Sequence, residues 1–157
     1  MHKLIEEDVT KIIRSVDFSP VIGKRVLITG ASGLIGIYLT ECLKALGDVE
    51  IHTISNTVTV DGTYHLCIDL SNTPFRFNKP FDYIIHAVGY GQPDKFMSDP
   101  IKTLMLNTGV TLNFMSCLKK DGRFLFLSSS EIYSGLSGKC TEDMVGITNT
   151  DHPRACY

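Results

Sequence analysis

The sequence predicts an α/β protein built on a doubly wound parallel sheet that is incomplete at its C-terminal end. From residue 24 onward, short apolar runs of strand length alternate with segments of helical periodicity, the pattern of a parallel sheet covered by helices on both faces. A glycine-rich turn joins the first such strand to the first such helix. The 157 residues, 43% of them apolar, suffice for one domain with a sizeable core.

The first expected element is a helical extension over residues 1–23, ahead of the main domain. Apolar residues recur there at helical spacing until the pattern stops near Pro20; they are Leu4, Ile5, Val9, Ile12, Ile13 and Val16. We expect this apolar stripe to pack on the domain that follows or on a part of the protein outside this chain. A contact between two copies of the chain is the alternative.

The main domain is expected to span residues 24–157. Strands are predicted at 25–29, 49–54, 64–68, 82–88 and 123–128, and helices at 34–46, closed by Gly47, and at 100–119. Residues 134–151 are rich in Gly, Ser and Thr and are predicted to form a loop, after which His152 and Pro153 are a candidate helix start.

The helix over residues 100–119 is the longest predicted element. Asp99 is expected to cap its first turn, which contains Pro100, and the helix is expected to stop at residues 119–122. Its buried stripe is predicted to consist of Ile101, Leu104, Met105, Leu106, Leu112, Met115 and Leu118.

Composition excludes several classes of partner. The chain carries 15 Lys and Arg against 17 Asp and Glu and has no basic stripe, so nucleic acid is not expected as a partner. Acidic residues interrupt residues 1–20, which argues against a secretory signal, and no apolar segment approaches the length of a membrane span. The five cysteines lie far apart and form no metal-ligand spacing with the histidines, so we expect free thiols, a cytoplasmic location and no metal site.

The turn at residues 29–36 is typical of a dinucleotide-binding (Rossmann) site. It lies directly between the predicted strand at 25–29 and the predicted helix at 34–46, which is the context that this motif requires. Glycines allow the sharp turn and the close approach of a pyrophosphate, and the N–H groups at the start of the helix attract that anion. A flexible surface loop is the alternative interpretation. The candidate cofactor-binding residues in the turn are Gly30, Ser32, Gly33, Leu34, Ile35 and Gly36.

Further candidates stand where the other strands end, because ligands of such sheets bind beyond the carboxyl ends of the strands. The second strand ends near Ser55, without the usual acid or a base, so the choice between NAD and NADP stays open. Asp69, followed by Leu70, is placed either to accept from an adenine amino group or to cap the strand. The small residues around His86, Ala87 and Val88 leave room for a nicotinamide ribose. Asn107, on the long helix, is expected either to be exposed to solvent or to make a structural hydrogen bond.

Several short motifs occur in a fixed order along the chain. They are Thr29-Gly30-x-x-Gly33-x-x-Gly36, Asp69, His86-Ala87, Asn107, Ser128-Ser129-Ser130-Glu131-Ile132-Tyr133 and Pro153-Arg154-Ala155-Cys156-Tyr157. Together, over residues 24–157, they resemble the extended short-chain dehydrogenase/reductase family, and within it the NAD-dependent nucleotide-sugar epimerases, dehydratases and decarboxylases. The serine run and the last five residues are similar to those of UDP-glucuronate decarboxylases, whereas dehydratases carry a similar acid at the Glu131 position.

The resemblance implies roles for individual residues. Tyr157 matches the general base that takes a proton from a sugar hydroxyl while hydride passes to the nicotinamide, and Ser129 matches the residue that bonds the same oxygen. Glu131 matches the acid/base of dehydratases and decarboxylases, with Ser130 beside it. Asn107 matches the family's structural asparagine.

The family activates that tyrosine with a lysine four residues later, but this chain ends at Tyr157. The resemblance therefore implies an N-terminal, inactive, cofactor-binding fragment of an enzyme that oxidises a sugar transiently at C4. The implied partner is a nucleotide sugar, UDP-linked, and a homodimer stays open. The alternative function is a non-catalytic dinucleotide-binding sensor or regulatory domain.

Overall fold

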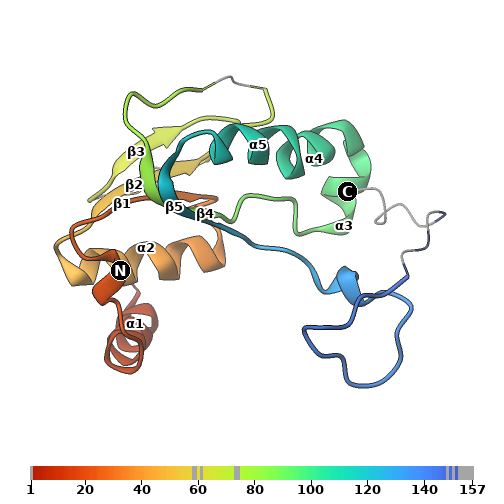
Figure 1. The fold of residues 1–157 in the computed structure, drawn as a ribbon, viewed down its shortest axis with the longest axis horizontal. Helices are drawn as coiled ribbons and strands as arrows, with labels where there is room; N and C mark the ends of the chain where they lie inside the picture. Colours follow the sequence, from red (N-terminus) through yellow and green to blue (C-terminus); the bar gives the residue numbers. More distant parts are fainter. Residues whose placement is uncertain are drawn as a thin grey trace.

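Parallel strands form the centre of the computed structural model, which describes residues 2–57, 60, 62–72, 75–147, 149 and 151. The described residues form a five-stranded sheet in the order β3-β2-β1-β4-β5, in which every neighbouring pair is parallel (Figure 1). The strands are β1 (Arg25–Thr29), β2 (Glu50–Ser55), β3 (Tyr64–Cys67), β4 (Phe81–His86) and β5 (Leu118–Phe126). This order confirms the predicted doubly wound sheet.

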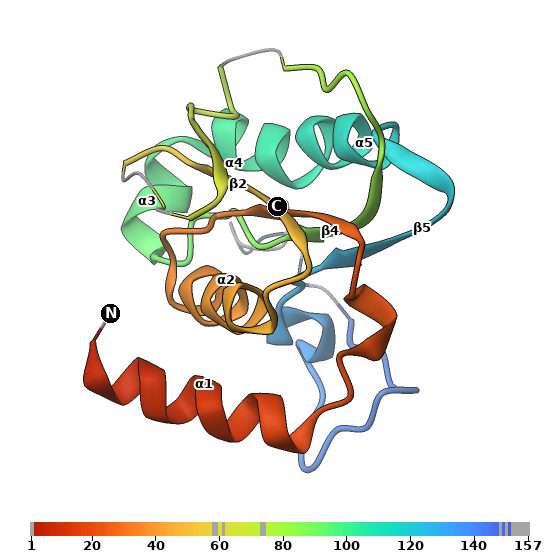
Figure 2. The ribbon, with the colours of Figure 1, turned by 90° about the vertical axis from the view of Figure 1, so that its left-hand side faces the viewer.

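Helices cover both faces of this sheet. Helix α2 lies on one face and α4 and α5 lie on the other, while α1 packs outside α2, away from the sheet (Figures 1 and 2). The helices are α1 (Lys3–Ser15), α2 (Leu34–Leu46), α3 (Pro93–Ser98), α4 (Pro100–Asn107) and α5 (Gly109–Met115), with short 3-10 turns η1 (Ser19–Val21) and η2 (Ser130–Tyr133). A parallel sheet buried on both faces needs two apolar layers.

Each face of the sheet has its own apolar layer. The layer under α4 and α5 contains Leu27, Ile54, Leu70, Phe81, Ile84, Leu106, Val110 and Phe114. The layer under α2 contains Val26, Ile28, Ala31, Leu43 and Ile51. Alternate residues of β1 therefore face opposite layers, as the two-residue period of a strand requires.

The first strand–turn–helix unit forms as predicted. β1 and α2 have the predicted bounds, and Gly47 follows α2 with φ +83°, a conformation that favours glycine. Asp99 also caps α4 as predicted, because its side chain accepts a hydrogen bond from the Lys102 amide at 3.1 Å.

The predicted single helix over residues 100–119 is wrong. The helical segment is interrupted at Thr108, and α5 ends at Met115 rather than at residues 119–122. The chain has to reach the sheet there, because the Phe81 amide already donates to the Cys117 carbonyl at 2.9 Å. The expected stop lies instead inside β5, at a register irregularity that precedes Arg123.

The predicted buried stripe of this segment is also wrong for most of its members. Thr103, Leu106, Val110 and Phe114 are buried. Ile101, Leu104, Met105, Leu112 and Met115 are exposed. The apolar residues of this segment point to all sides of the helix, so their spacing alone did not decide which side faces the sheet.

The helical extension contacts the domain through α2. Val9 is buried, and the Tyr38 hydroxyl donates to the Asp8 carboxylate at 3.0 Å. Leu4 and Val16, at the two ends of the predicted stripe, remain exposed. The stripe thus packs partly on the domain, and the division of the chain at residue 23 stays a prediction.

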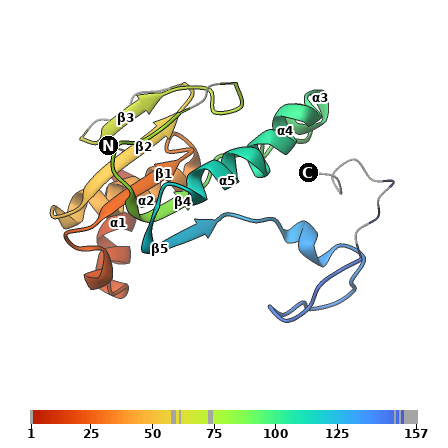
Figure 3. The same cartoon turned by 45° about the horizontal axis from the view of Figure 1, so that its top comes forward.

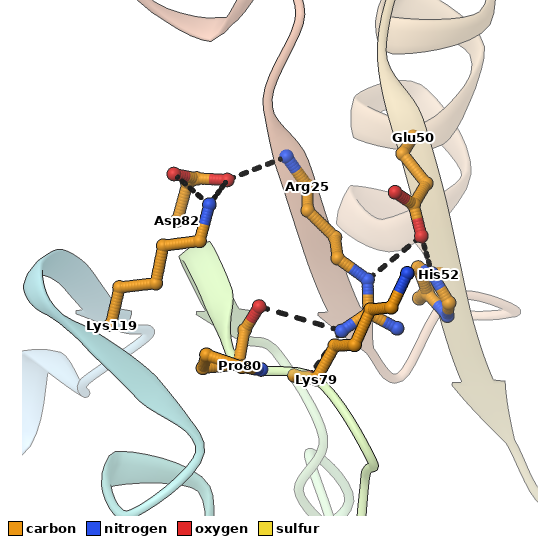
Figure 4. Close-up of polar contacts among 7 residues, drawn as sticks. All are labelled: Arg25, Glu50, His52, Lys79, Pro80, Asp82 and Lys119. Carbon is orange, nitrogen blue, oxygen red and sulfur yellow. Dashed lines mark hydrogen bonds and ion pairs between the residues drawn. The ribbon is translucent and has the colours of Figure 1, made fainter.

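Charged side chains join the amino ends of the strands, at the edge opposite the glycine turn (Figure 4). The Arg25 guanidinium lies over the Phe81 ring and donates from Nε to Glu50 at 2.7 Å and from Nη1 to the Pro80 and Lys79 carbonyls. His52 Nε2 lies 2.8 Å from the same Glu50 oxygen. Hydrogen bonds from His52 and Arg25 lower the pKa of Glu50, whereas burial lowers the pKa of His52, so a neutral His52 donates to the carboxylate.

Asp82 connects β4 to both of its neighbours at this edge. It accepts from the Arg25 amide at 2.9 Å and from Lys119 Nζ at 2.7 Å (Figure 4). Burial acts to raise the pKa of Asp82, but the hydrogen bonds from Lys119 and Arg25 outweigh it and the pKa is lowered. These contacts hold the strand starts in register and leave the opposite edge to the candidate site.

Within the described part of the chain, every helix is too short or too polar to cross a membrane. Among the described residues, Cys42, Cys67, Cys117 and Cys140 are free thiols. Cys156 and the candidate helix start at His152 and Pro153 lie outside the described residues.

Replacing Thr40 with valine is expected to stabilise the protein. Among the described residues, the Thr40 hydroxyl is a buried side-chain oxygen without a hydrogen-bond partner. Removing such a group relieves a desolvation cost of about 1 kcal/mol. Urea unfolding should therefore give a higher free energy for the variant. Thr53→Val is the matched control, because the Thr53 hydroxyl contacts Thr63 and His65 at 2.7 and 2.8 Å. Its loss should destabilise the protein. Equal effects of the two changes would contradict the expectation.

Candidate dinucleotide-binding site

The glycine turn leaves β1 sharply and enters α2 without a side-chain cap. Gly30 has φ +68°, and its carbonyl accepts from the Gly33 amide at 2.9 Å. The Ala31 amide donates to the Ile54 carbonyl at 3.1 Å, which ties the turn to β2. Gly33 is the N-cap residue of α2. The turn thus presents the amino end of a 13-residue helix at the carboxyl edge of the sheet.

Two of the glycines are required by close backbone contacts. A Cβ on Gly30 would lie 2.6 Å from the Ala87 carbonyl oxygen and 2.9 Å from the Val88 nitrogen. A Cβ on Gly36 would overlap the Gly30 carbonyl oxygen and lie 2.7 Å from the Ala31 Cα. These contacts pack the turn between the loop after β4 and the first turn of α2, which is the arrangement that brings backbone N–H groups to a pyrophosphate.

The surface beside this turn is accessible to a ligand. Gly33 is exposed, Ser32 is half-buried, and Leu34 and Ile35 in the first turn of α2 are 76% and 52% exposed. A Cβ on Gly33 would come within 3.2 Å of the Gly30 carbonyl oxygen. The donor set of the turn, made of backbone amides and a helix amino end, therefore fits the diphosphate of a dinucleotide.

The residues at and after the end of β4 lie against this turn, but some of their side chains face the site and others are buried in the core. Ala87 and Val88 are half-buried, and their peptide contacts Gly30. His86 is 1% exposed, so its ring lies in the core and does not line the site. The Val88 amide donates to the Thr29 hydroxyl at 3.3 Å. Thr29 belongs to the predicted motif but was not among the candidate site residues, although a hydroxyl at the last position of β1 is a signal for such a bond.

The ends of β2 and β3 supply polar groups of different kinds. Ser55, the last residue of β2, is 4% exposed, and its hydroxyl oxygen lies 3.4 Å from His65 Nε2. Asp69 accepts hydrogen bonds from the Ser71 hydroxyl at 2.6 Å and the Ser71 amide at 3.0 Å. The Ser71 hydroxyl bond is the main cause that lowers the pKa of Asp69. Asp69 therefore caps its own turn, one of the two predicted alternatives, and the adenine contact stays a prediction. Leu70 is buried in the core layer under α4 and α5.

Asn107 is half-buried and is the last residue of α4, next to the interruption at Thr108. It lies at the end of a helix rather than inside one, because the predicted long helix is divided there. Its role as a structural asparagine stays a prediction.

The segment after β5 begins beside the end of β4, where the Leu127 amide donates to the His86 carbonyl at 3.1 Å. It extends away from the sheet, with η2 near its start (Figures 1 and 3). Ser129 and Ser130 are exposed, Glu131 is half-buried, and the Ser129 hydroxyl accepts from the Glu131 amide at 3.2 Å. Their roles at the site stay predictions. Tyr157 lies outside the described residues.

The sheet order, the glycine turn and the helix amino end together define a dinucleotide-binding fold. The chain belongs to the NAD dependent epimerase/dehydratase family, whose model matches residues 26–157. This membership confirms the resemblance and the predicted cofactor class, since the family is named for its dependence on NAD.

Relatives with known names agree with this assignment. The chain is 35% identical over 146 residues to UDP-glucuronic acid decarboxylase 1 of Danio rerio, a match that covers 85% of this chain and 34% of the relative. It is 31% identical over 148 residues to UDP-glucuronic acid decarboxylase 2 of Arabidopsis thaliana, with 86% and 32% covered. The chain therefore spans about a third of the length of the curated relatives it matches.

Solved structures share the fold. UDP-N-acetylglucosamine 4-epimerase from Methanobrevibacter ruminantium M1, in complex with UDP-N-acetylmuramic acid, superposes with a TM-score of 0.66 at 18% identity, over 85% of this chain and 46% of that one. MoeE5 in complex with UDP-glucuronic acid and NAD gives the same TM-score at 22% identity, over 84% and 46%.

Proposed function

We propose that this chain is the cofactor-binding part of an NAD-dependent enzyme that acts on a nucleotide sugar. The observation that carries the proposal is the close packing of Gly30 and Gly36, which leaves the backbone amides of the turn and the amino end of α2 at one accessible edge. A diphosphate bound there would be held by Gly33 and its neighbours through the backbone. Leu34 and Ile35 would contact the ligand beside it.

The proposed substrate is UDP-linked and the proposed reaction passes through oxidation of the sugar at C4. NAD, when bound, supplies the acceptor for the hydride that this oxidation releases. Tyr157 is proposed to take the proton from the C4 hydroxyl, Ser129 to bond the same oxygen, and Glu131, with Ser130, to act as acid/base in the later step. The similarity to UDP-glucuronic acid decarboxylases favours decarboxylation over epimerisation or dehydration.

We further propose that the 157 residues alone do not complete the reaction. What supports this proposal is that the segment that carries Ser129 and Glu131 extends away from the sheet (Figure 3). The same observation favours the second candidate function, a dinucleotide-binding sensor without catalysis. The free thiols support a cytoplasmic location.

Binding and turnover separate these functions. Titration calorimetry of the 157-residue chain with NAD, with NADP for comparison, is expected to show saturable binding of NAD. Incubation with UDP-glucuronate and NAD is expected to yield no product from this chain, whereas the protein encoded by the full reading frame should release carbon dioxide. Failure of the chain to bind NAD would contradict both functions, and a full reading frame that binds NAD without turnover would favour the sensor.

A further inference from the structure

His86 is a buried titratable residue that the proposed chemistry does not use. It is the last residue of β4, its ring is 1% exposed, and it lies among the rings of Phe114, Phe124 and Phe126 at centroid distances of 5.4, 5.9 and 5.6 Å. Both ring nitrogens nevertheless have partners. A neutral imidazole has one N–H donor and one acceptor nitrogen, so its partners decide which nitrogen carries the proton.

The direction of each hydrogen bond follows from the donors. His86 Nε2 lies 3.2 Å from the Leu106 carbonyl oxygen, which only accepts, so the proton is on Nε2. His86 Nδ1 therefore accepts, and its partner is the Thr29 hydroxyl at 3.0 Å. Because that hydroxyl donates to His86, its oxygen is free to accept from the Val88 amide at 3.3 Å. Every donor in this chain of bonds meets an acceptor.

This chain of bonds joins three parts of the fold around the glycine turn. Thr29 precedes Gly30, whose Cα packs against the Ala87–Val88 peptide, so the Thr29–Val88 bond holds together the two backbone segments that form the cradle. At the other end, the Leu106 carbonyl also accepts from the Thr111 hydroxyl at 3.4 Å, across the interruption between α4 and α5. Side chains that bond into a helix in this way are a recognised cause of breaks.

We propose that His86 is a positioning residue for the cofactor, which acts through Thr29 to hold the Ala87–Val88 peptide against the glycine turn. The proposal rests on the proposed function, because it assumes that this turn binds NAD. His86 does not touch the cofactor itself. It acts through the tautomer that the Leu106 carbonyl selects, which makes the Thr29 hydroxyl a donor to the ring and an acceptor for Val88.

Protonation of His86 would disrupt this arrangement. A charged ring donates from both nitrogens, so the Thr29 oxygen would receive two donors and its own proton would lose its partner. Within the described part of the chain, the hydrogen-bond and ring partners of His86 are Thr29, Phe114, Phe124, Phe126 and the Leu106 carbonyl. None of these partners is charged. Burial lowers the pKa of His86 below 6.5, against the opposing effect of the Leu106 bond. The neutral form, and with it the cradle, is therefore present at neutral pH and is lost as the pH falls below 6.5 toward the lowered pKa.

The test measures NAD affinity against pH for a set of variants of the whole chain. Thr29→Val removes the hydroxyl with little change of shape, and Thr29→Ser retains it. His86→Asn keeps an acceptor near the Nδ1 position and removes the titration. His52→Gln is the control, because burial also lowers the pKa of His52, whereas this half-buried ring contacts Glu50 at the amino end of β2 rather than the glycine turn (Figure 4). Thermal unfolding of each variant records its stability separately.

Thr29→Val is expected to weaken NAD binding about tenfold at neutral pH, and Thr29→Ser to restore it to within about threefold of the parent. The parent and His52→Gln should lose affinity for NAD in parallel as the pH falls, whereas the affinity of His86→Asn should not change with pH. A merely structural role would lower thermal stability and leave NAD affinity and its pH profile unchanged.

Unchanged affinity in Thr29→Val would overturn the inference even if His86→Asn failed to fold. If the parent binds NAD and its profile is flat, the inference alone is wrong. If the parent does not bind NAD, the proposed function fails and the positioning role fails with it.

Discussion

Replacing Gly36 with alanine is expected to abolish NAD binding and to lower the free energy of unfolding by about 3 kcal/mol. The added Cβ would overlap the Gly30 carbonyl oxygen and lie 2.7 Å from the Ala31 Cα and 2.9 Å from the Gly30 carbonyl carbon. All three neighbours are backbone atoms of the turn, so none can turn aside as a side chain would. The helix must move away from the strand, and the amides that would hold a diphosphate move with it.

Gly91→Ala is the matched control for this change. A Cβ on Gly91 would meet nothing within 4 Å, and the residue has no positive φ, so we expect stability within about 0.5 kcal/mol of the parent and unchanged NAD binding. For both variants, calorimetric titration measures the affinity for NAD, and urea unfolding measures the free energy of unfolding. A Gly36→Ala protein that binds NAD as well as Gly91→Ala does would show that this packing is not needed for the cofactor.

Replacing Phe114 with alanine is expected to cost about 4 kcal/mol of stability, one of the largest losses available in this fold. Its side chain is fully buried in the layer under α5 and lies 4.4 Å from Phe75 and 5.4 Å from His86, measured between ring centroids. Truncation leaves a cavity between the helix and the sheet that these rings cannot fill without moving. Urea unfolding measures the loss, and Phe114→Leu, with a smaller expected loss, serves if the alanine variant does not fold.

Leu112→Ala provides the control in the same helix. Leu112 is 67% exposed in the structure, so its truncation should change stability by no more than about 0.5 kcal/mol. The sequence periodicity predicted the opposite, with Leu112 in the buried stripe. If Leu112→Ala costs as much as Phe114→Ala, the side of α5 that faces the sheet is the one that the periodicity indicated.

Features that depend on neighbouring residues were predictable from the sequence. β1, the glycine turn and α2 form a local unit, in which glycine positions, strand propensity and helix end signals all lie within about 25 residues and agree. The Asp99 cap is equally local. The order of the motifs then sufficed to recognise the family, which the match over residues 26–157 confirms.

Features that depend on packing between distant segments were not predictable. The division between α4 and α5 and the choice of Phe114 over Leu112 as the buried residue follow from how this segment meets β4 and β5. His86 was predicted to line the site because of its place at a strand end, and its burial became evident only from the rings that surround it.

The sequence by itself therefore determined the fold class, the cofactor turn and the family, because strand and helix periods and glycine requirements are properties of short stretches of chain. The tertiary structure decided which helix face is buried, where the helix is interrupted and how His86 connects to the glycine turn. These depend on contacts such as Thr29 with His86 and His86 with Leu106, which join residues 57 and 20 positions apart. No local pattern records such contacts, since they exist only once the sheet has assembled.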